Sequence, residues 1–177
     1  MVKYLRASST EELQQIITLQ QENILKGELT PTALKDGFLS LQHHISLLEK
    51  MNAACPHIIA KEGDLVVGYA LTMLSTFRNE IPMLTPMFTT ADLLLPEKNY
   101  IAMGQICIHK DYRKKGIFKG MYHFYKSELN HKYDCLITEV ATNNKRSFGA
   151  HLSVGFKSIN TEVKNGASWE LISWDWI

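Results

Sequence analysis

The stretch from Ile101 to Ala141 constrains the fold most, because its hydrophobic period changes twice. IAMGQICIH (101–109) is a β-rich run, and YDCLITEVA (133–141) is an apolar run suited to a strand buried on both faces. Between them, RKKGIFKGMYHFYKSELNH (113–131) is typical of an amphipathic helix whose apolar side carries Ile117, Phe118, Met121, Tyr122, Tyr125 and Leu129. The segment therefore predicts a strand, a helix and a second strand in succession.

Residues 1–56 predict a strand followed by two helices. Residues 2–6 alternate as in a short strand, and Ser9 and Glu12 then stand at capping-box spacing before an apolar-periodic segment. A second helix is expected to begin near Pro31, where proline suits the first turn, and to end at Cys55-Pro56. Its expected apolar face consists of Leu34, Phe38, Leu41, Ile45 and Leu48.

The rest of the chain completes a mixed pattern. Residues 57–74 predict a hairpin with its turn at Gly63 and Asp64, whereas 78–99 contain prolines and no clean period, which indicates an ordered insertion or lid. NNKRSFGAHLSVGF (143–156) predicts a helix, and SWELISWDWI (168–177) predicts a final strand after a turn at Asn165 and Gly166. This order is that of an α/β (α+β) fold with helices on the faces of one sheet.

Composition narrows the functional classes. With 177 residues the chain fits one domain, and a net charge of +1 gives little general attraction to nucleic acid or an anionic membrane. The three cysteines are an odd number without CxxC spacing, which favours reduced thiols in the cytoplasm. No apolar run is long enough to cross a bilayer, and no histidine spacing indicates a metal site. We therefore expect a cytoplasmic protein with no metal, no membrane partner and no nucleic-acid partner.

A basic cluster at the start of the helix expected from near Lys114 is the first functional signal. Arg113, Lys114 and Lys115 precede Gly116, and Gly120 follows one turn later. Each glycine inside a helix costs about 0.5–1 kcal/mol relative to alanine, so the pair suggests that another group approaches the backbone closely. A solvated helix end and an anion site at the first turn both fit this pattern. Neither a P-loop nor a GxGxxG loop is present.

Two segments resemble the GNAT superfamily of N-acetyltransferases. QICIHKDYRKKGIFKGMY (105–122) is similar to its cofactor-binding motif, with Ile108, Lys110, Arg113, Gly116 and Phe118 at the motif positions, although Lys110 and Phe118 depart from it. NNKRSFGAHLSVGF is similar to the second family motif through Asn144, Ser147, His151, Gly155 and Phe156. The segments stand in the family order, and the resemblance covers roughly residues 57–176.

The resemblance implies a mixed, splayed central sheet of about six or seven strands with helices on both faces. Its two central parallel strands would be those containing 106–108 and 136–140, which would separate to admit the pantetheine arm of acetyl-CoA. Residues 1–177 would form a single acetyltransferase domain, with 1–56 on the acceptor side, 57–177 as the cofactor-binding core and 78–99 as the insertion or lid.

The resemblance also assigns cofactor-binding residues. The backbone of 106–108 would pair with pantetheine, the N–H groups of 114–119 would hold the pyrophosphate, and Asn144 would bond the pantetheine amides or cap the following helix. The expected set is Ile106, Cys107, Ile108, Arg113, Lys114, Lys115, Gly116, Ile117, Phe118, Lys119, Asn144 and Ser147.

Acetyl transfer to a primary amine suggests two catalytic residues. Glu139 is a candidate base or ammonium anchor, unless it faces solvent or pairs with a lysine or arginine. His151 stands where the family commonly has a tyrosine acting as general acid, and a helix histidine bonded to a neighbouring element is the alternative. Cys107, between two isoleucines, is expected to be a small core residue, which favours direct transfer in a ternary complex over a covalent intermediate.

The predicted function is an acetyl-CoA-dependent N-acetyltransferase that acts on a small-molecule or peptide amine. A non-catalytic module that binds or senses acyl-CoA is the alternative. The apolar residues of the insertion, which include Met83, Leu84, Met87 and Phe88, suit an acceptor lid and equally the surface of a homodimer.

Overall fold

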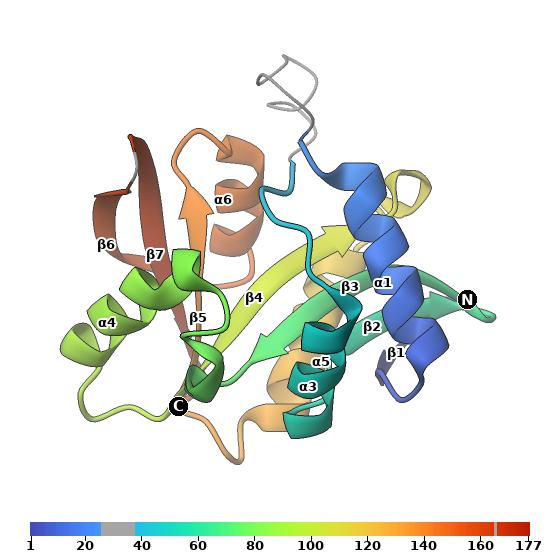
Figure 1. Cartoon of the computed structure of the whole chain (residues 1–177), viewed down its shortest axis with the longest axis horizontal. Coiled ribbons are helices and arrows are strands. Elements are labelled where there is room, and N and C mark those ends of the chain that lie inside the picture. Colours follow the sequence, from blue (N-terminus) through green and yellow to red (C-terminus); the bar gives the residue numbers. More distant parts are fainter. Residues whose placement is uncertain (26–37, 165) are drawn as a thin grey trace. The chain divides into compact units, whose positions relative to one another are not determined.

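The computed structural model describes residues 1–25, 38–164 and 166–177, which contain a seven-stranded sheet (Figure 1). The strand order is β1-β2-β3-β4-β5-β7-β6, with β4 and β5 parallel and the pairs β1/β2, β2/β3, β5/β7 and β6/β7 antiparallel. The strands are β1 Lys3–Arg6, β2 Ile58–Glu62, β3 Leu65–Met73, β4 Tyr100–Ile108, β5 Cys135–Ala141, β6 Lys157–Lys164 and β7 Ala167–Asp175. The predicted mixed sheet is confirmed.

The described chain divides into two compact units. The first unit consists of 1–25, 38–73 and 103–128, and the second of 74–102, 129–164 and 166–177, so β4 contributes to both. Parallel pairing joins Tyr100–Ala102 of β4 to Cys135–Ile137 of β5, and these residues all belong to the second unit.

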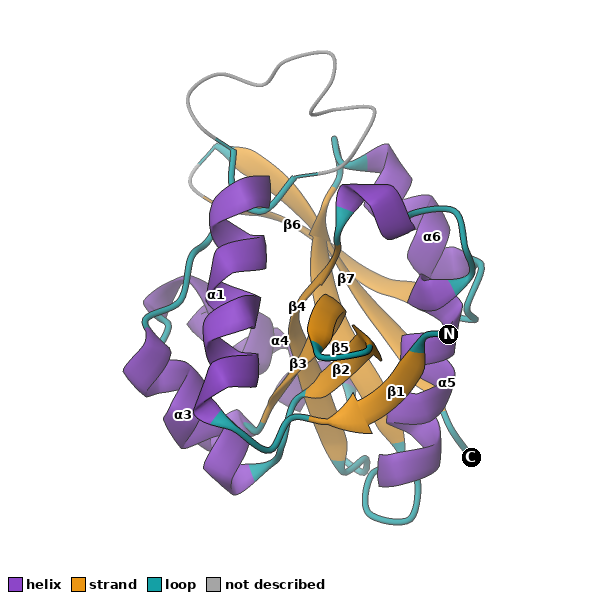
Figure 2. Cartoon of the chain, turned by 90° about the vertical axis from the view of Figure 1, so that its right-hand side faces the viewer, coloured by secondary structure: helices purple, strands orange, loops and turns teal. Residues whose placement is uncertain are grey.

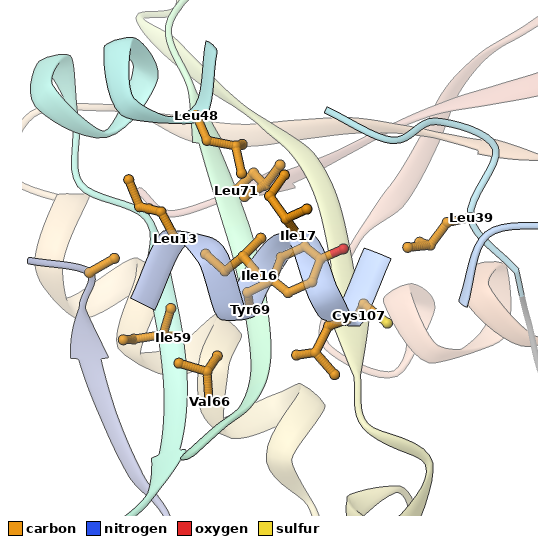
Figure 3. Close-up of a cluster of buried hydrophobic side chains, with 12 residues drawn as sticks. Leu13, Ile16, Ile17, Leu39, Leu48, Ile59, Val66, Tyr69, Leu71 and Cys107 are labelled. Carbon is orange, nitrogen blue, oxygen red and sulfur yellow. The ribbon is translucent and has the colours of Figure 1, made fainter. Parts of the chain in front are cut away.

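In the first unit, α1 (Thr10–Asn23) and α3 (Ile45–Ala54) cover one face of β1–β3 and α5 (Ile117–Leu129) covers the other (Figure 2). Helix α1 begins where predicted, because the Ser9 hydroxyl accepts a hydrogen bond from Glu12 N, while the Glu12 carboxylate accepts one from Ser8 N. Its apolar residues pack with α3, β2 and β3 in one core (Figure 3), which includes Leu13, Ile16, Ile17, Leu48, Ile59, Tyr69 and Leu71.

The prediction of one long second helix is wrong for its described part. Pro31 and Leu34 lie outside the described residues, and 38–44 are not helical. Leu39 forms a bridge with Ile24 instead: its N–H donates to Asn23 O, and Leu25 N donates to its carbonyl. Since these backbone groups bond the end of α1, they cannot form helical bonds at the same time. Helix α3 starts only at Ile45, and it ends at Ala54 as expected.

In the second unit, α4 (Thr85–Leu94) and α6 (Lys145–Leu152) lie on opposite faces of β5, β7 and β6 (Figure 2). Helix α4 falls inside the insertion at 78–99, which is therefore more regular than its prolines suggested. Pro86 occupies the first turn of α4, where its missing N–H is harmless, and Met87, Phe88 and Ala91 face the interior. Short 3₁₀ turns at Ser75–Phe77 and Pro82–Leu84 precede it.

Strand β6 is the element that the sequence did not reveal. It is half exposed and pairs antiparallel with β7 over Lys157–Lys164, where polar residues dilute its apolar alternation. Among the described residues, no helix combines the length and the apolar character needed to span a membrane.

Candidate active site

The loop before α5 has the backbone shape of an anion site. Lys114 has φ 62° and Gly116 has φ 78°, so two left-handed residues alternate with Lys115 immediately before the first helical turn. A Cβ at Gly116 would meet nothing within 4 Å, so glycine is needed there for its backbone conformation. Turns of this kind direct successive N–H groups into one concavity, and the N–H groups of a first helical turn have no partner within the helix.

Arg113 stabilises this loop from inside the protein. Its Nε donates to the carbonyl of Ile108 at 3.2 Å and its Nη2 donates to Asn23 Oδ1 at 2.6 Å. The guanidinium therefore joins the end of β4, the loop and the end of α1. Arg113, the basic residue at this motif position, therefore fixes the shape of the loop in addition to contributing positive charge.

The lysines around the loop face solvent. Lys114, Lys115 and Lys119 are exposed, and Lys115 Nζ lies 4.9 Å from the centre of the Tyr112 ring, whose hydroxyl donates to Glu62. Long exposed side chains can move toward a bound anion at little energetic cost. The loop thus combines a shaped backbone with mobile positive charge.

Gly120 has a different role from the one expected. A Cβ there would overlap the Tyr4 ring of β1, whose Cε2 would be only 2.8 Å away. Tyr4 also stacks on Phe124 of α5 at 6.5 Å between ring centres. The group that approaches the helix backbone at Gly120 is therefore a side chain of the protein itself, and Gly116 keeps its place in the set of residues expected to bind the cofactor.

Ile106, Cys107 and Ile108 end β4, a 3₁₀ turn at Lys110–Tyr112 connects the strand to the loop, and Cys107 O faces Gly68 of β3. Burial raises the pKa of the Cys107 thiol to about 11. The thiol is therefore protonated at neutral pH, which agrees with the expected core role and not with a nucleophile.

Phe118, at the position where the motif has a small residue, turns its ring edge-on to Tyr122 at 5.0 Å between centres.

Asn144 and Ser147 begin α6 in the second unit. The Asn144 side chain accepts a hydrogen bond from Ser147 N at 3.2 Å, so Asn144 is the N-cap of this helix, as one of its two expected roles requires. Ser147 is half-buried, and its carbonyl is bonded by His151.

His151 is buried on α6, with 1% of its surface exposed. Its Nδ1 lies 2.7 Å from the Ser147 carbonyl, which can only accept, so Nδ1 carries the proton and Nε2 carries the lone pair. The ring also packs edge-on against Phe156 at 5.2 Å between centres. Burial lowers the pKa of His151 to about 4, so the ring is neutral at pH 7 and cannot supply a proton as imidazolium.

Glu139 is half-buried on β5 and has a specific partner. Its Oε1 accepts a hydrogen bond from Lys164 Nζ of β6, and the same ammonium lies 3.3 Å from Glu162 Oε2. Burial raises the pKa of Glu139, and the Lys164 ammonium opposes that effect. Glu139 is thus paired with a lysine, which was one of the alternatives to a free catalytic base, and its side chain is shielded from solvent.

Lys164 is a residue that sequence reasoning missed. The signal that could have found it is the alternation of β6, since Glu162 and Lys164 are two residues apart and point to one face. The expected site residues thus fall into two groups: 106–108 and 113–119 in the first unit, and Glu139, Asn144, Ser147 and His151 in the second. No group of three or more metal-ligating side chains occurs in the described residues.

The chain belongs to the acetyltransferase (GNAT) family, whose sequence model matches residues 20–156. A search of curated proteins found no match. Solved structures with the same fold include the ribosomal-protein-S18-alanine N-acetyltransferase from Escherichia coli, with a TM-score of 0.67, 11% identity and coverage of 99% of this chain and 94% of that one.

Two further structures contain the cofactor or a part of it. The NatC complex bound to Gag peptide and CoA has a TM-score of 0.70 and 14% identity, covering 98% of each chain. The yncA protein from Salmonella typhimurium, solved with acetyl-CoA, has a TM-score of 0.65 and 13% identity, covering 99% of this chain and 94% of that one. At these identities the likeness establishes the fold, and the family model establishes the membership.

Proposed function

We propose that this protein is an acetyl-CoA-dependent N-acetyltransferase that acts on a primary amine by direct attack in a ternary complex. The observation that carries the proposal is the loop before α5, with left-handed backbone at Lys114 and Gly116 and three exposed lysines around it. That arrangement suits a pyrophosphate. Membership of the GNAT family supports acetyl transfer in general.

The residues present fit acetyl-CoA on the side of the phosphates. The N–H groups of 114–119 would bind the pyrophosphate, Arg113 would keep the loop closed, and Lys114, Lys115 and Lys119 would supply charge. The backbone of 106–108 would pair with pantetheine, and Asn144 and Ser147 are the expected contacts from α6. When bound, acetyl-CoA supplies a thioester whose carbonyl carbon accepts the amine.

In the proposed reaction a C–N bond forms between the amine and the acetyl carbon, and the C–S bond breaks. A free lysine side chain has a pKa of about 10.4 and an α-amine about 8, so one proton must leave the amine before or during attack. Glu139 is the proposed acceptor of that proton, because burial makes it a stronger base than an exposed carboxylate while Lys164 favours its ionised form.

His151 does not fit the general acid role in the imidazolium form. We propose that it positions the start of α6 through its bond to Ser147 O and that Nε2, which carries the lone pair, can only accept a hydrogen bond. A thiolate leaving group with a pKa near that of cysteine, about 8.5, can take its proton from water or from the positively charged nitrogen that attack on the thioester creates, which must lose a proton to become the amide. The chemistry therefore has no need of a strong acid at this position.

The acceptor class is proposed from the substrates in the names of the structural relatives. Two of the structural relatives are named for, or bound to, peptide or protein substrates, and this supports a peptide amine among the candidates together with small amines. The cytoplasm is the compartment that the proposal implies, since acetyl-CoA and the three free thiols of Cys55, Cys107 and Cys135 suit it.

A non-catalytic acyl-CoA-binding or sensing protein is the alternative. One observation favours it: the neutral ring of His151 donates its one proton, on Nδ1, to Ser147 O and so has none to give to a leaving thiolate. It predicts cofactor binding without turnover of any amine. Turnover therefore separates the two functions.

The test is calorimetric titration with acetyl-CoA, with ATP and ADP as controls for a site that accepts any phosphate. We expect micromolar affinity for acetyl-CoA, at least about tenfold above the controls, which corresponds to about 1.4 kcal/mol. Release of CoA is then measured with a panel of amines and peptides. Equal affinity for all three nucleotides would refute the cofactor site, and tight binding with no turnover on a broad panel would favour the alternative.

A further inference from the structure

The cluster of Glu139, Lys164 and Glu162 in the second unit is an unusual feature of its half-exposed β6–β7 hairpin. The Glu139 and Lys164 side chains are only 7% and 12% exposed, whereas Glu162 is 38% exposed. Charged side chains are rarely buried to this extent unless they are paired. Desolvation largely offsets the attraction in such a pair, so a buried salt bridge is weak evidence for a role in stability.

Strand register explains how the three side chains meet. Glu139 lies opposite Leu171 of β7, and Glu162 and Lys164 lie opposite Trp169 and Ala167 of the same strand. All these residues point to one face of the sheet because side chains alternate along a strand. The Lys164 side chain crosses that face and reaches Glu139.

The surroundings leave few other charges that act on Glu139. Glu170 of β7 points to the opposite face, where it accepts hydrogen bonds from Ser158 and Thr161. From α4, Thr90 donates to Glu162 at 3.4 Å, while Asp92 of the same helix is paired with Arg78. Lys164 and Glu162 are therefore the charges that act on Glu139 through these contacts.

We propose that Lys164 is a positioning residue for Glu139, which holds the carboxylate ionised and oriented for its part in amine deprotonation, and that Glu162 limits this effect by sharing the ammonium. The inference rests on the proposed function, since it assigns Lys164 a part only if Glu139 acts on the amine. It extends the site to β6, which neither motif of the family includes.

The electrostatic balance gives the proposal its sign. Burial disfavours the ionised form of Glu139, Lys164 favours it, and Glu162 disfavours it, so the pKa of Glu139 is raised overall. Loss of the Lys164 charge should raise this pKa further and leave less ionised base at neutral pH. Loss of the Glu162 charge should lower it, because the ammonium then serves one carboxylate instead of two.

The experiment compares the pH dependence of kcat for wild type, Lys164→Arg, Lys164→Met and Glu162→Gln with one amine acceptor. Lys164→Met should reduce kcat at pH 7 by at least about tenfold and move the acid limb to higher pH. Lys164→Arg should remain within about threefold, because it keeps the charge. Glu162→Gln should move the acid limb to lower pH. Lys157→Met, an exposed lysine at the other end of β6, is the matched control and should change nothing.

A merely structural salt bridge would give a different result: Lys164→Met would lower thermal stability while the acid limb stayed in place. That outcome would overturn the proposal. If Lys164→Met does not fold, the other two variants still test the proposal. The acid limb of Glu162→Gln should move to lower pH, and Lys164→Arg should keep its activity. Acetyl-CoA affinity, measured for each variant, should stay within about threefold of wild type, because none of these residues belongs to the cofactor loop.

A second readout separates failure of this inference from failure of the proposed function. The Glu139 side-chain carbonyl can be titrated by carbon-detected NMR in wild type and in Glu162→Gln, without any turnover. A Glu139 midpoint that is lower in Glu162→Gln than in wild type supports the electrostatic coupling of Glu162 to Glu139, even if no acceptor is found. An unchanged midpoint refutes it even in an active enzyme. Wild type that turns over amines while Glu139→Gln is equally active would refute the role of Glu139 and with it that of Lys164.

Discussion

The two groups of candidate site residues are built in different ways. The loop at 113–119 in the first unit relies on backbone conformation and exposed lysines, with one arginine fixing its shape. The second unit holds Glu139 and His151, both titratable, both shielded from solvent and both bonded to a named partner. Under the proposed function, the loop would bind the cofactor, whereas Glu139 of the second group would take part in the chemistry.

The difference teaches which properties burial controls. The lysines of the loop are exposed, so few neighbouring groups need to be known to interpret them. The protonation states of Glu139 and His151 depend on desolvation and on partners that are distant in sequence, such as Lys164. The comparison therefore predicts that loop variants change affinity and that variants of the buried group change turnover and pH dependence.

Replacement of Glu139 should have the largest effect. Glu139→Gln removes the proposed base while keeping the shape of the side chain, so kcat should fall by about 10²–10⁴. Acetyl-CoA affinity should stay within about threefold. Steady-state kinetics and calorimetry on the same preparation measure both quantities. Affinity and turnover falling together would contradict the division into binding and chemical groups.

Stability should decrease as the pH falls from about 6.5 to about 4. The pKa values of His43 and His151 are lowered to about 4 and that of His57 to about 3, in each case chiefly by burial. The unfolded chain therefore binds more protons in this window, and each histidine contributes a slope of up to about 1.4 kcal/mol per pH unit. Urea unfolding at several pH values measures it.

His151→Gln tests how much His151 contributes to the pH dependence of the free energy of unfolding. The variant should unfold with a shallower pH dependence over the same window, since one titrating group is gone. Its turnover should keep the acid limb of wild type, because the neutral ring is not the source of that limb. An acid limb that disappears in His151→Gln would restore the histidine as a proton donor or acceptor.

Gly116 tests the binding group. Gly116→Ala places a side chain at φ 78°, a left-handed conformation that costs about 1–2 kcal/mol outside glycine. Because the loop is exposed, we expect it to relax in the free protein, so that acetyl-CoA affinity falls by about five- to thirtyfold. Turnover at saturating acetyl-CoA should change little. Unaltered affinity would show that the left-handed backbone has no part in binding.

Alanine substitutions at two helical glycines, one from each unit, should have the smallest effects, and these are effects on stability. Gly120→Ala in α5 should destabilise the protein by about 1–3 kcal/mol, because its Cβ would overlap Tyr4. Gly149→Ala in α6 meets nothing within 4 Å and should stabilise by about 0.5–1 kcal/mol. Thermal unfolding measures both, and Tyr4→Leu combined with Gly120→Ala should recover part of the loss. Equal effects of the two alanines would refute the packing role of Gly120.

Local patterns predicted most of the fold, and the failures have physical causes. The strands at 2–6, 57–74, 101–109, 133–141 and 168–177 were recognisable because apolar alternation and turn residues are local signals. The helix predicted through 38–44 is wrong, since its apolar spacing suits a helix while the backbone of Leu39 forms hydrogen bonds with Asn23 and Leu25 instead. Helix α4 was hidden by prolines that its first turn tolerates.

The sequence by itself determined the family, the mixed sheet and the position of the loop before α5, because motif spacing and hydrophobic period are properties of residues close together in the chain. Only the tertiary structure decided that Gly120 accommodates Tyr4, that His151 is neutral and that Glu139 is paired with Lys164. The physical reason is that side-chain contacts and desolvation depend on residues brought together by folding, which spacing along the chain does not encode.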